Sequence, residues 1–202
     1  MHLIFKHTKI NNKKEEKGLS LIESAMVLAL AATVTAGVMF YYQSASDSNK
    51  TQAAISEVMS ATSAINGLYI GRSDYSGLSE SVLINSSAIP DNYKDQQNTK
   101  IRNPFGGNLS VKAKGASSQA SFGYHITLDN LPKSACVSLA TLNLGTSAAG
   151  YGVNINNLEN YNGTFGTTVS SGSAKNSAIT PGEAASSCTA NNNSNKVTYF
   201  MK

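Results

Sequence analysis

The chain has 202 residues, a length that suits one compact domain with an accessory segment, and 41% of them are hydrophobic. Only 14% are charged, against about a quarter in an average soluble domain, and small polar residues take their place. The formal net charge of +4 is concentrated in residues 1–18, which hold five of the 16 basic and two of the 12 acidic residues. Because the remainder has no dispersed basic surface, the composition argues against nucleic-acid binding.

The first elements in chain order are a basic leader and an apolar run. Residues 1–18 are polar and basic, whereas residues 19–42 are 24 positions with no proline and one glycine, Gly37. As a helix this run would be roughly 36 Å long, enough to cross a bilayer. Lysines precede the run and only Lys50 follows closely, so the positive-inside rule places the leader in the cytoplasm and the later residues outside it.

The helix is expected to continue beyond the membrane, over residues 19–70 in all. No proline occurs between Tyr42 and Pro90, and apolar residues recur at helical spacing. The residues of this stripe are Ile55, Val58, Met59, Thr62, Ile65 and Tyr69. We therefore expect an amphipathic second half that packs against a head domain of residues 71–202.

The head is expected to be mostly β-structure. Residues 71–108 are rich in turn formers and indicate a connecting loop. Short β-rich runs bounded by Gly, Asn or Ser predict strands, which we place at residues 108–113, 121–128, 151–155 and 196–201. The predicted fold class is α+β, a long N-terminal helix packed on a mostly antiparallel sheet with short extra helices.

Two short helices are predicted between these strands. The first covers residues 132–145, with Pro132 in its first turn and Gly145 at its end. The second covers residues 180–188, where Thr180 and Glu183 form the pattern of a capping box around Pro181.

The chain has two cysteines, Cys136 and Cys188, and their spacing excludes CxxC redox and zinc patterns. In an oxidising compartment they would form one disulfide. The alternative is two free, buried thiols.

One acid, Glu23, lies near the start of the apolar run. At the centre of a membrane helix an acid costs roughly 2.5–3.5 kcal/mol, and near an end it costs less because it reaches the interface. A cut between Gly18 and Leu19 would remove the leader and create an α-amine on Leu19. Glu23 lies one turn further on and could pair with that amine, its own or that of a neighbouring subunit. The alternative from the residues alone is an uncleaved signal anchor.

The segment Gly18-Leu19-Ser20-Leu21-Ile22-Glu23 resembles the prepilin-peptidase signal of type IV pilins. The long leader and the residue Leu19 resemble the type IVb subclass, and further similar segments extend over nearly all of residues 17–202. The resemblance implies the type IV pilin fold, cleavage after Gly18, N-methylation of Leu19 and a requirement for Glu23 in assembly. It also implies a Cys136–Cys188 disulfide that bounds a surface region, residues 136–188. The chain departs from the type IVa pattern because its apolar run lacks proline.

The same resemblance implies a major structural subunit of filaments that bundle and mediate adhesion, auto-aggregation and microcolony formation. Its partners would be copies of itself, a prepilin peptidase and N-methyltransferase, an assembly platform, ATPases, a secretin, host cells and neighbouring bacteria. The precursor would lie in the inner membrane with its head in the periplasm, and the mature form in the extracellular pilus. The alternative is a minor pilin, or a pseudopilin of a secretion system.

The sequence gives little indication of catalysis. His125 is the one histidine outside the leader, and its context "SFGYHITL" favours a strand residue over a base. The nucleophile-elbow, P-loop and HExxH patterns are absent from the sequence. We therefore expect no enzymatic activity, no catalytic residues, no cofactor and no metal.

Overall fold

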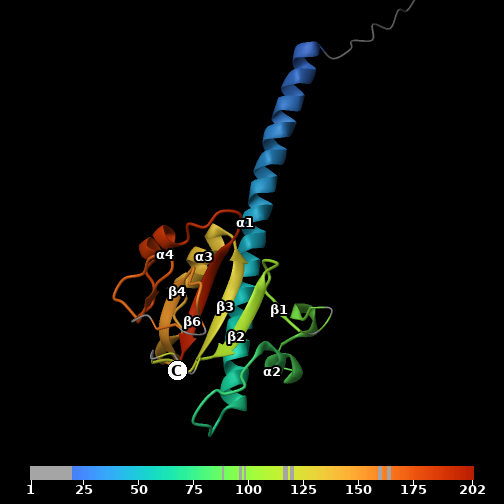
Figure 1. The fold of residues 1–202 in the computed structure, drawn as a ribbon. Coiled ribbons are helices and arrows are strands. Elements are labelled where there is room, and N and C mark those ends of the chain that lie inside the picture. Colours follow the sequence, from blue (N-terminus) through green and yellow to red (C-terminus); the bar gives the residue numbers. More distant parts are fainter. Residues whose placement is uncertain are drawn as a thin grey trace, which may run out of the picture. The chain divides into compact units, whose positions relative to one another are not determined.

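The computed structural model describes residues 20–87, 89–95, 97, 99–115, 118, 121–158, 161–162 and 165–202 (Figure 1). Two compact units divide the chain, one ending at Gln43 and the other comprising Ser44–Lys202. The predicted leader, residues 1–18, and Leu19 lie outside the described residues.

Helix α1, Leu21–Leu68, runs without interruption, as its sequence predicts. It contains no proline, so no backbone N–H is missing from its hydrogen-bond ladder. Shortly after its end, Gly71 has a φ of 78°, a conformation that glycine adopts without the steric cost of a Cβ atom.

The head contains a six-stranded sheet in the order β1-β2-β3-β6-β4-β5, and neighbouring strands are antiparallel. The strands are β1 (Ile101–Arg102), β2 (Asn108–Ala113), β3 (Tyr124–Leu131), β4 (Ala148–Val153), β5 (Ala174–Lys175) and β6 (Asn195–Met201). The C-terminal strand β6 thus lies between β3 and β4 in the middle of the sheet (Figure 1). The predicted α+β fold class is confirmed.

The prediction that residues 71–108 form only a connecting loop is wrong. This segment contains helix α2 (Glu80–Asn85), the short 3-10 helix η1 (Asp91–Tyr93) and the edge strand β1. Helix α2 buries Leu83 and Ile84 in the core, and Ile101 of β1 pairs with Leu109 of β2. These elements are held by core burial and by pairing with β2, which turn-forming residues do not reveal.

Two strands begin and end at other residues than predicted. The run at 121–128 begins as a strand only at Tyr124 and continues to Leu131, although Gly123 N already donates to Met201 O and Gly123 O accepts from Lys114 N. The run at 151–155 begins at Ala148 and ends at Val153, because Asn154 turns the backbone with a φ of 56°.

The helix predicted at 132–145 is shorter than expected. Helix α3 (Lys133–Ala140) ends well before Gly145, which instead opens the 3-10 helix η2 (Gly145–Ser147). The hydroxyl of Tyr151, on β4, accepts a hydrogen bond from Leu144 N and donates one to Asn143 Oδ1, and these bonds hold the chain in a turn. Helix α4 (Pro181–Ser187) has the predicted capping box, with Glu183 N donating to Thr180 Oγ1.

The main core lies between α1 and one face of the sheet. Ala54, Val58, Ala61 and Ile65 of α1 are fully buried in the same cluster as apolar residues of β2, β3 and β6. The predicted stripe was wrong at Met59, whose side chain is 58% exposed, while Glu57 is buried in its place. A smaller cluster centred on Phe122 and Phe200 covers part of the other face of the sheet.

Candidate functional site

The first half of α1 presents apolar side chains to its surroundings around its whole circumference. From Leu21 to Tyr42 the large side chains are exposed, Leu21 by 85% and Phe40 by 74%. The hydroxyls of Thr33 and Thr35 donate to backbone carbonyls of the preceding turn, so they add little polarity to this surface. By length and composition this helix is able to cross a membrane.

Glu23 is the one charged residue between Ser20 and Ser46. It lies in the first turn of α1, and its Oε2 accepts a hydrogen bond of 3.0 Å from Ser20 N. A carboxylate there interacts favourably with the helix dipole and satisfies an otherwise unpaired N–H. The exposed acid is therefore at the end of the helix where an α-amine on Leu19 would lie, although Gly18 and Leu19 themselves are outside the described residues.

The two cysteines form a disulfide, as predicted for an oxidising compartment. Cys136 lies in α3 and Cys188 follows α4, with Cα atoms 6.0 Å apart and 52 positions apart in sequence. Both side chains are fully buried, and the disulfide joins α3 to the residue at the end of α4. Residues 136–188 therefore form a closed loop that includes β4, β5 and α4.

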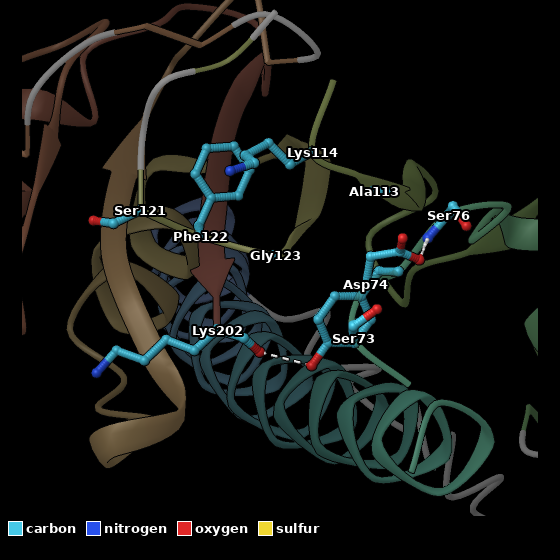
Figure 2. Close-up of a pocket in the computed structure, with 10 residues that line it drawn as sticks. Ser73, Asp74, Ser76, Ala113, Lys114, Ser121, Phe122, Gly123 and Lys202 are labelled. Carbon is cyan, nitrogen blue, oxygen red and sulfur yellow. Dashed lines mark hydrogen bonds between the residues drawn. The ribbon is translucent and has the colours of Figure 1, made fainter. Parts of the chain in front are cut away.

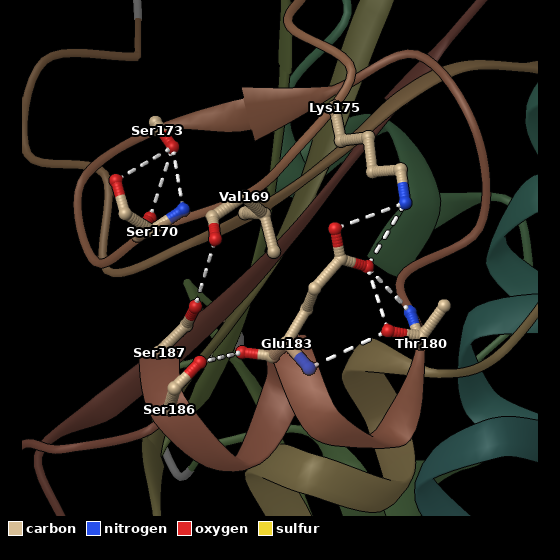
Figure 3. A network of polar contacts seen from close by, with 8 residues as sticks. All are labelled: Val169, Ser170, Ser173, Lys175, Thr180, Glu183, Ser186 and Ser187. Carbon is tan, nitrogen blue, oxygen red and sulfur yellow. Dashed lines mark hydrogen bonds and ion pairs between the residues drawn. The ribbon is translucent and has the colours of Figure 1, made fainter.

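A second link within this loop is an ion pair. Lys175 Nζ, on β5, lies 3.1 Å from Glu183 Oε1 and 2.9 Å from Oε2, and Oε2 also accepts bonds from the N and Oγ1 of Thr180 (Figure 3). The hydrogen bond from Lys175, followed by those from Thr180, lowers the pKa of Glu183 to about 2. The carboxylate is therefore fixed in its ionised form and ties β5 to the start of α4.

Further hydroxyl contacts close the same region. Ser187 Oγ donates to Val169 O at 3.4 Å, and Ser173 Oγ accepts from Ser170 N at 2.8 Å (Figure 3). These bonds join neutral groups, and they fix the shape of the loop.

His125 is a strand residue, as predicted. It lies on β3, opposite Lys112 of β2 and Phe200 of β6, and is buried. Since side chains alternate along a strand, His125 points away from the face that contacts α1 and packs near the rings of Phe122 and Phe200.

A pocket opens where the chain ends. It lies between residues 73–76, residues 113–114 and the turn before β3, with Phe122 and Lys114 on one side and Asp74 on the other (Figure 2). Tyr75 donates a hydrogen bond of 2.8 Å from its hydroxyl to the carbonyl oxygen of Lys202, which fixes the C-terminus beside the pocket. Its walls combine two aromatic rings, Tyr75 and Phe122, with the charged side chains of Asp74, Lys114 and Lys202.

The structure brings two of the predicted site residues together, because Cys136 and Cys188 form a disulfide. Glu23 belongs to the other compact unit, where it accepts a hydrogen bond from Ser20 N. Sequence reasoning missed the ion pair of Lys175 and the burial of Glu57. No group of three or more His, Cys, Asp or Glu able to hold a metal occurs in the part of the chain that the structure describes.

The chain combines an α+β head that contains a buried disulfide with a long helix whose first half exposes its large apolar side chains, the combination expected of a pilin. The chain belongs to the bundlin family, whose family model matches residues 43–202. It is 69% identical over 195 residues to the major structural subunit of the bundle-forming pilus of Escherichia coli O111:H-. The corresponding subunit of Escherichia coli O127:H6 (strain E2348/69 / EPEC) has the same identity, and each match covers 96% of this chain and 99% of the relative.

Among solved structures, the chain matches the crystal structure of TcpA, a type IV pilin from Vibrio cholerae El Tor biotype. The TM-score is 0.49 at 16% sequence identity, and the match covers 76% of this chain and 99% of TcpA.

Proposed function

We propose that this chain is the major structural subunit of a bundle-forming type IVb pilus. The supporting observation is the 69% identity to two such subunits over nearly the whole length of both chains. The role is structural and not enzymatic: copies of the chain assemble into a filament that mediates adhesion, auto-aggregation and microcolony formation.

The apolar half of α1 supports a filament in which helices bundle at the core. Its large side chains are exposed in the single chain, and removal of apolar surface from water is favourable by about 25 cal/mol per Å². Before assembly the same surface would hold the precursor in the inner membrane with its head in the periplasm. The mature subunit would then leave the membrane for the extracellular pilus.

The second part of the proposal concerns removal of the leader and the alignment of neighbouring subunits in the filament. Residues 1–18 are a leader removed after Gly18, residues 19–70 are the long helix, and residues 71–202 are the head. Leu19 becomes the N-methylated first residue, and Glu23 pairs with the α-amine of a neighbouring subunit during assembly. The partners are a prepilin peptidase and N-methyltransferase, an assembly platform, ATPases and a secretin, and later host cells and neighbouring bacteria.

Mass spectrometry of subunits from sheared pili tests the processing. The expected N-terminal peptide begins with a methylated Leu19. A peptide that still contains residues 1–18, or an unmodified N-terminus, would contradict the processing step.

Replacement of Glu23 tests its role in assembly. In a strain that depends on this chain, Glu23→Ala and Glu23→Gln are expected to abolish filaments while the leader is still removed. The control is Ser24→Ala, which alters the neighbouring position and loses only a hydrogen bond to Leu21 O. Normal filaments from both Glu23 variants would refute the pairing with an amine.

The protein composition of purified filaments distinguishes a major subunit from a minor pilin or pseudopilin. If this chain is the major subunit, it will account for nearly all the protein in purified filaments. A trace amount in filaments made of another pilin would favour the alternative.

A further inference from the structure

Glu57 is a buried acid in the interface between α1 and the sheet. Its side chain is only 4% exposed, on the same helix face as Ala54, Val58 and Ala61. Neither carboxyl oxygen has a hydrogen-bond partner in the described part of the chain. A buried polar group without a partner is costly, and a buried charge without a partner is more so.

No charge on α1 is close enough to compensate Glu57. The positions one turn away on either side are Ala53, Ala54, Ser60 and Ala61, and no charged residue follows Glu57 before the helix ends. Lys50 and Asp47 are the nearest charged positions on the helix, two and almost three turns before it.

Burial alone raises the pKa of Glu57, and no charged group in the described part of the chain contributes to that shift. The ionisable groups that the sheet adds to this core are phenols, Tyr124 of β3, Tyr151 of β4 and Tyr199 of β6, and burial raises the pKa of all three above the ordinary value. Helix α2 contributes Glu80, whose Oε1 accepts a hydrogen bond from Val111 N. His125 points to the opposite face of the sheet.

The surroundings of Glu57 therefore favour its neutral form. Burial is the physical cause, and it raises the pKa of Glu57 from 4.5 to about 8. As a neutral acid the side chain costs the interface one or two unmade hydrogen bonds. As a carboxylate it would need water or a cation, and the core cluster that this face of α1 joins is built from apolar and aromatic side chains.

We propose that Glu57 makes the docking of the amphipathic half of α1 onto the sheet depend on protonation. The neutral acid is accommodated among the apolar side chains of the interface. Loss of the proton places an uncompensated charge there, and the helix loosens from the sheet so that water reaches the carboxylate. The head is then most firmly closed in mildly acidic surroundings.

The direction in which stability changes with pH follows from the linkage between folding and proton binding. The folded state holds the proton more tightly than the unfolded chain, so the stabilisation is fully present below the unfolded pKa near 4.5 and is lost as the pH rises through the folded pKa near 8. One proton in this window corresponds to a fall of about tenfold in the folding equilibrium constant per pH unit.

Unfolding of the full chain in neutral detergent micelles, followed at pH 5, 6, 7, 8 and 9, tests the proposal. The wild-type folding constant is expected to fall across this range, and Glu57→Gln is expected to remove most of the fall because glutamine does not titrate. Any contribution of His125 cancels in the difference between the two proteins. The matched control is Glu80→Gln, an acid near the same interface, which should keep the wild-type slope.

Equal pH slopes for wild type and Glu57→Gln would overturn the proposal, as would loss of the slope in Glu80→Gln alone. A second measurement does not depend on the variant folding. The carboxyl ¹³C resonance of Glu57 in the wild-type chain should titrate near pH 8, and amide hydrogen exchange in residues 54–65 should accelerate over the same range. A midpoint near 4.5, or exchange that does not change with pH after correction for its intrinsic rate, would refute it.

Discussion

Lys175 on β5 and Glu183 in the first turn of α4 form an ion pair in which one ammonium group lies 2.9 and 3.1 Å from the two carboxylate oxygens. The lysine side chain is only 10% exposed, unlike the partners of an ordinary surface pair. The same carboxylate completes the capping box with Thr180, so one acid joins a strand to a helix and also begins that helix.

Neutralising this acid should change the acid stability of the head. Because the pKa of Glu183 is lowered to about 2, its contribution is present above its ordinary value near 4.5 and is lost as the pH falls toward 2. Glu183→Gln keeps the cap and removes the charge. Thermal unfolding from pH 7 to pH 2 should therefore show a lower Tm than wild type at pH 7 and a smaller loss on acidification.

The matched control is the ion pair of Lys94 and Asp91, in which the lysine side chain is 14% exposed but the acid is 95% exposed, against 21% for Glu183. Exposed pairs contribute about 0–1 kcal/mol, so Lys94→Met should change the Tm little and Lys175→Met considerably more. Equal changes in Tm for the two lysine substitutions would show that the pair of Lys175 and Glu183 contributes no more to stability than the pair of Lys94 and Asp91.

Loss of the disulfide should destabilise the head by more than any single hydrogen bond. The cross-link spans 52 positions, and the chain-entropy model gives about 4 kcal/mol for a loop of that length. Denaturant unfolding of the reduced chain and of a Cys136→Ala/Cys188→Ala double variant should agree on the loss. A double variant as stable as the oxidised chain would contradict the expectation.

A methyl group at Gly107 should be poorly tolerated. A Cβ atom there would collide with Asp129 O and Asp129 Oδ1 and would lie 2.7 Å from Asn130 Cβ. Overpacking of this kind typically costs about 1–3 kcal/mol, so Gly107→Ala should lower the midpoint of denaturant unfolding.

Gly182 provides the comparison. It lies inside α4 with open space where a Cβ would be, so Gly182→Ala should stabilise the head slightly, by about 0.5–1 kcal/mol, because alanine favours the helix. Similar midpoints of denaturant unfolding for the two variants would mean that the structure around Gly107 accommodates a methyl group without loss of stability.

Asn154 should show separate backbone and side-chain contributions. Its φ is 56°, and its side chain accepts a hydrogen bond from Lys196 N at 2.8 Å and donates one to Ser187 O at 3.2 Å. Asn154→Ala loses these bonds and strains the backbone, whereas Asn154→Gly loses only the bonds. In thermal unfolding, the Tm should fall for both variants and fall further for alanine; a larger loss for glycine would contradict the structural reasoning.

Local signals in the sequence predicted the elements that local interactions hold. The capping box of Thr180 and Glu183 is a pattern of three-residue spacing, and it forms as predicted. Strand β2 has the predicted bounds, Asn108–Ala113, because the burial of its side chains alternates along the strand and turns that contain glycine precede and follow it. The unbroken helix α1 follows from the absence of proline in a long periodic segment.

The shortest elements of the head were missed. Strands β1 and β5 have two residues each and exist because β2 and β4 pair with them, β1 across a short hairpin and β5 across a longer loop. Helix α2 follows Ser79 at its N-cap, but that side chain makes no cap hydrogen bond and the helix is held by burial of Leu83 and Ile84.

Periodicity and hydropathy, which act over short distances along the chain, were enough to predict a long helix with an apolar first half and one acid at its start. The even cysteine count predicted the disulfide. The apolar stripe of the second half predicted the burial of Val58 and Ile65, but not that Glu57 is buried and Met59 is 58% exposed. Those two outcomes depend on which side chains of the head pack against each position of the helix, and these packing partners are distant in sequence.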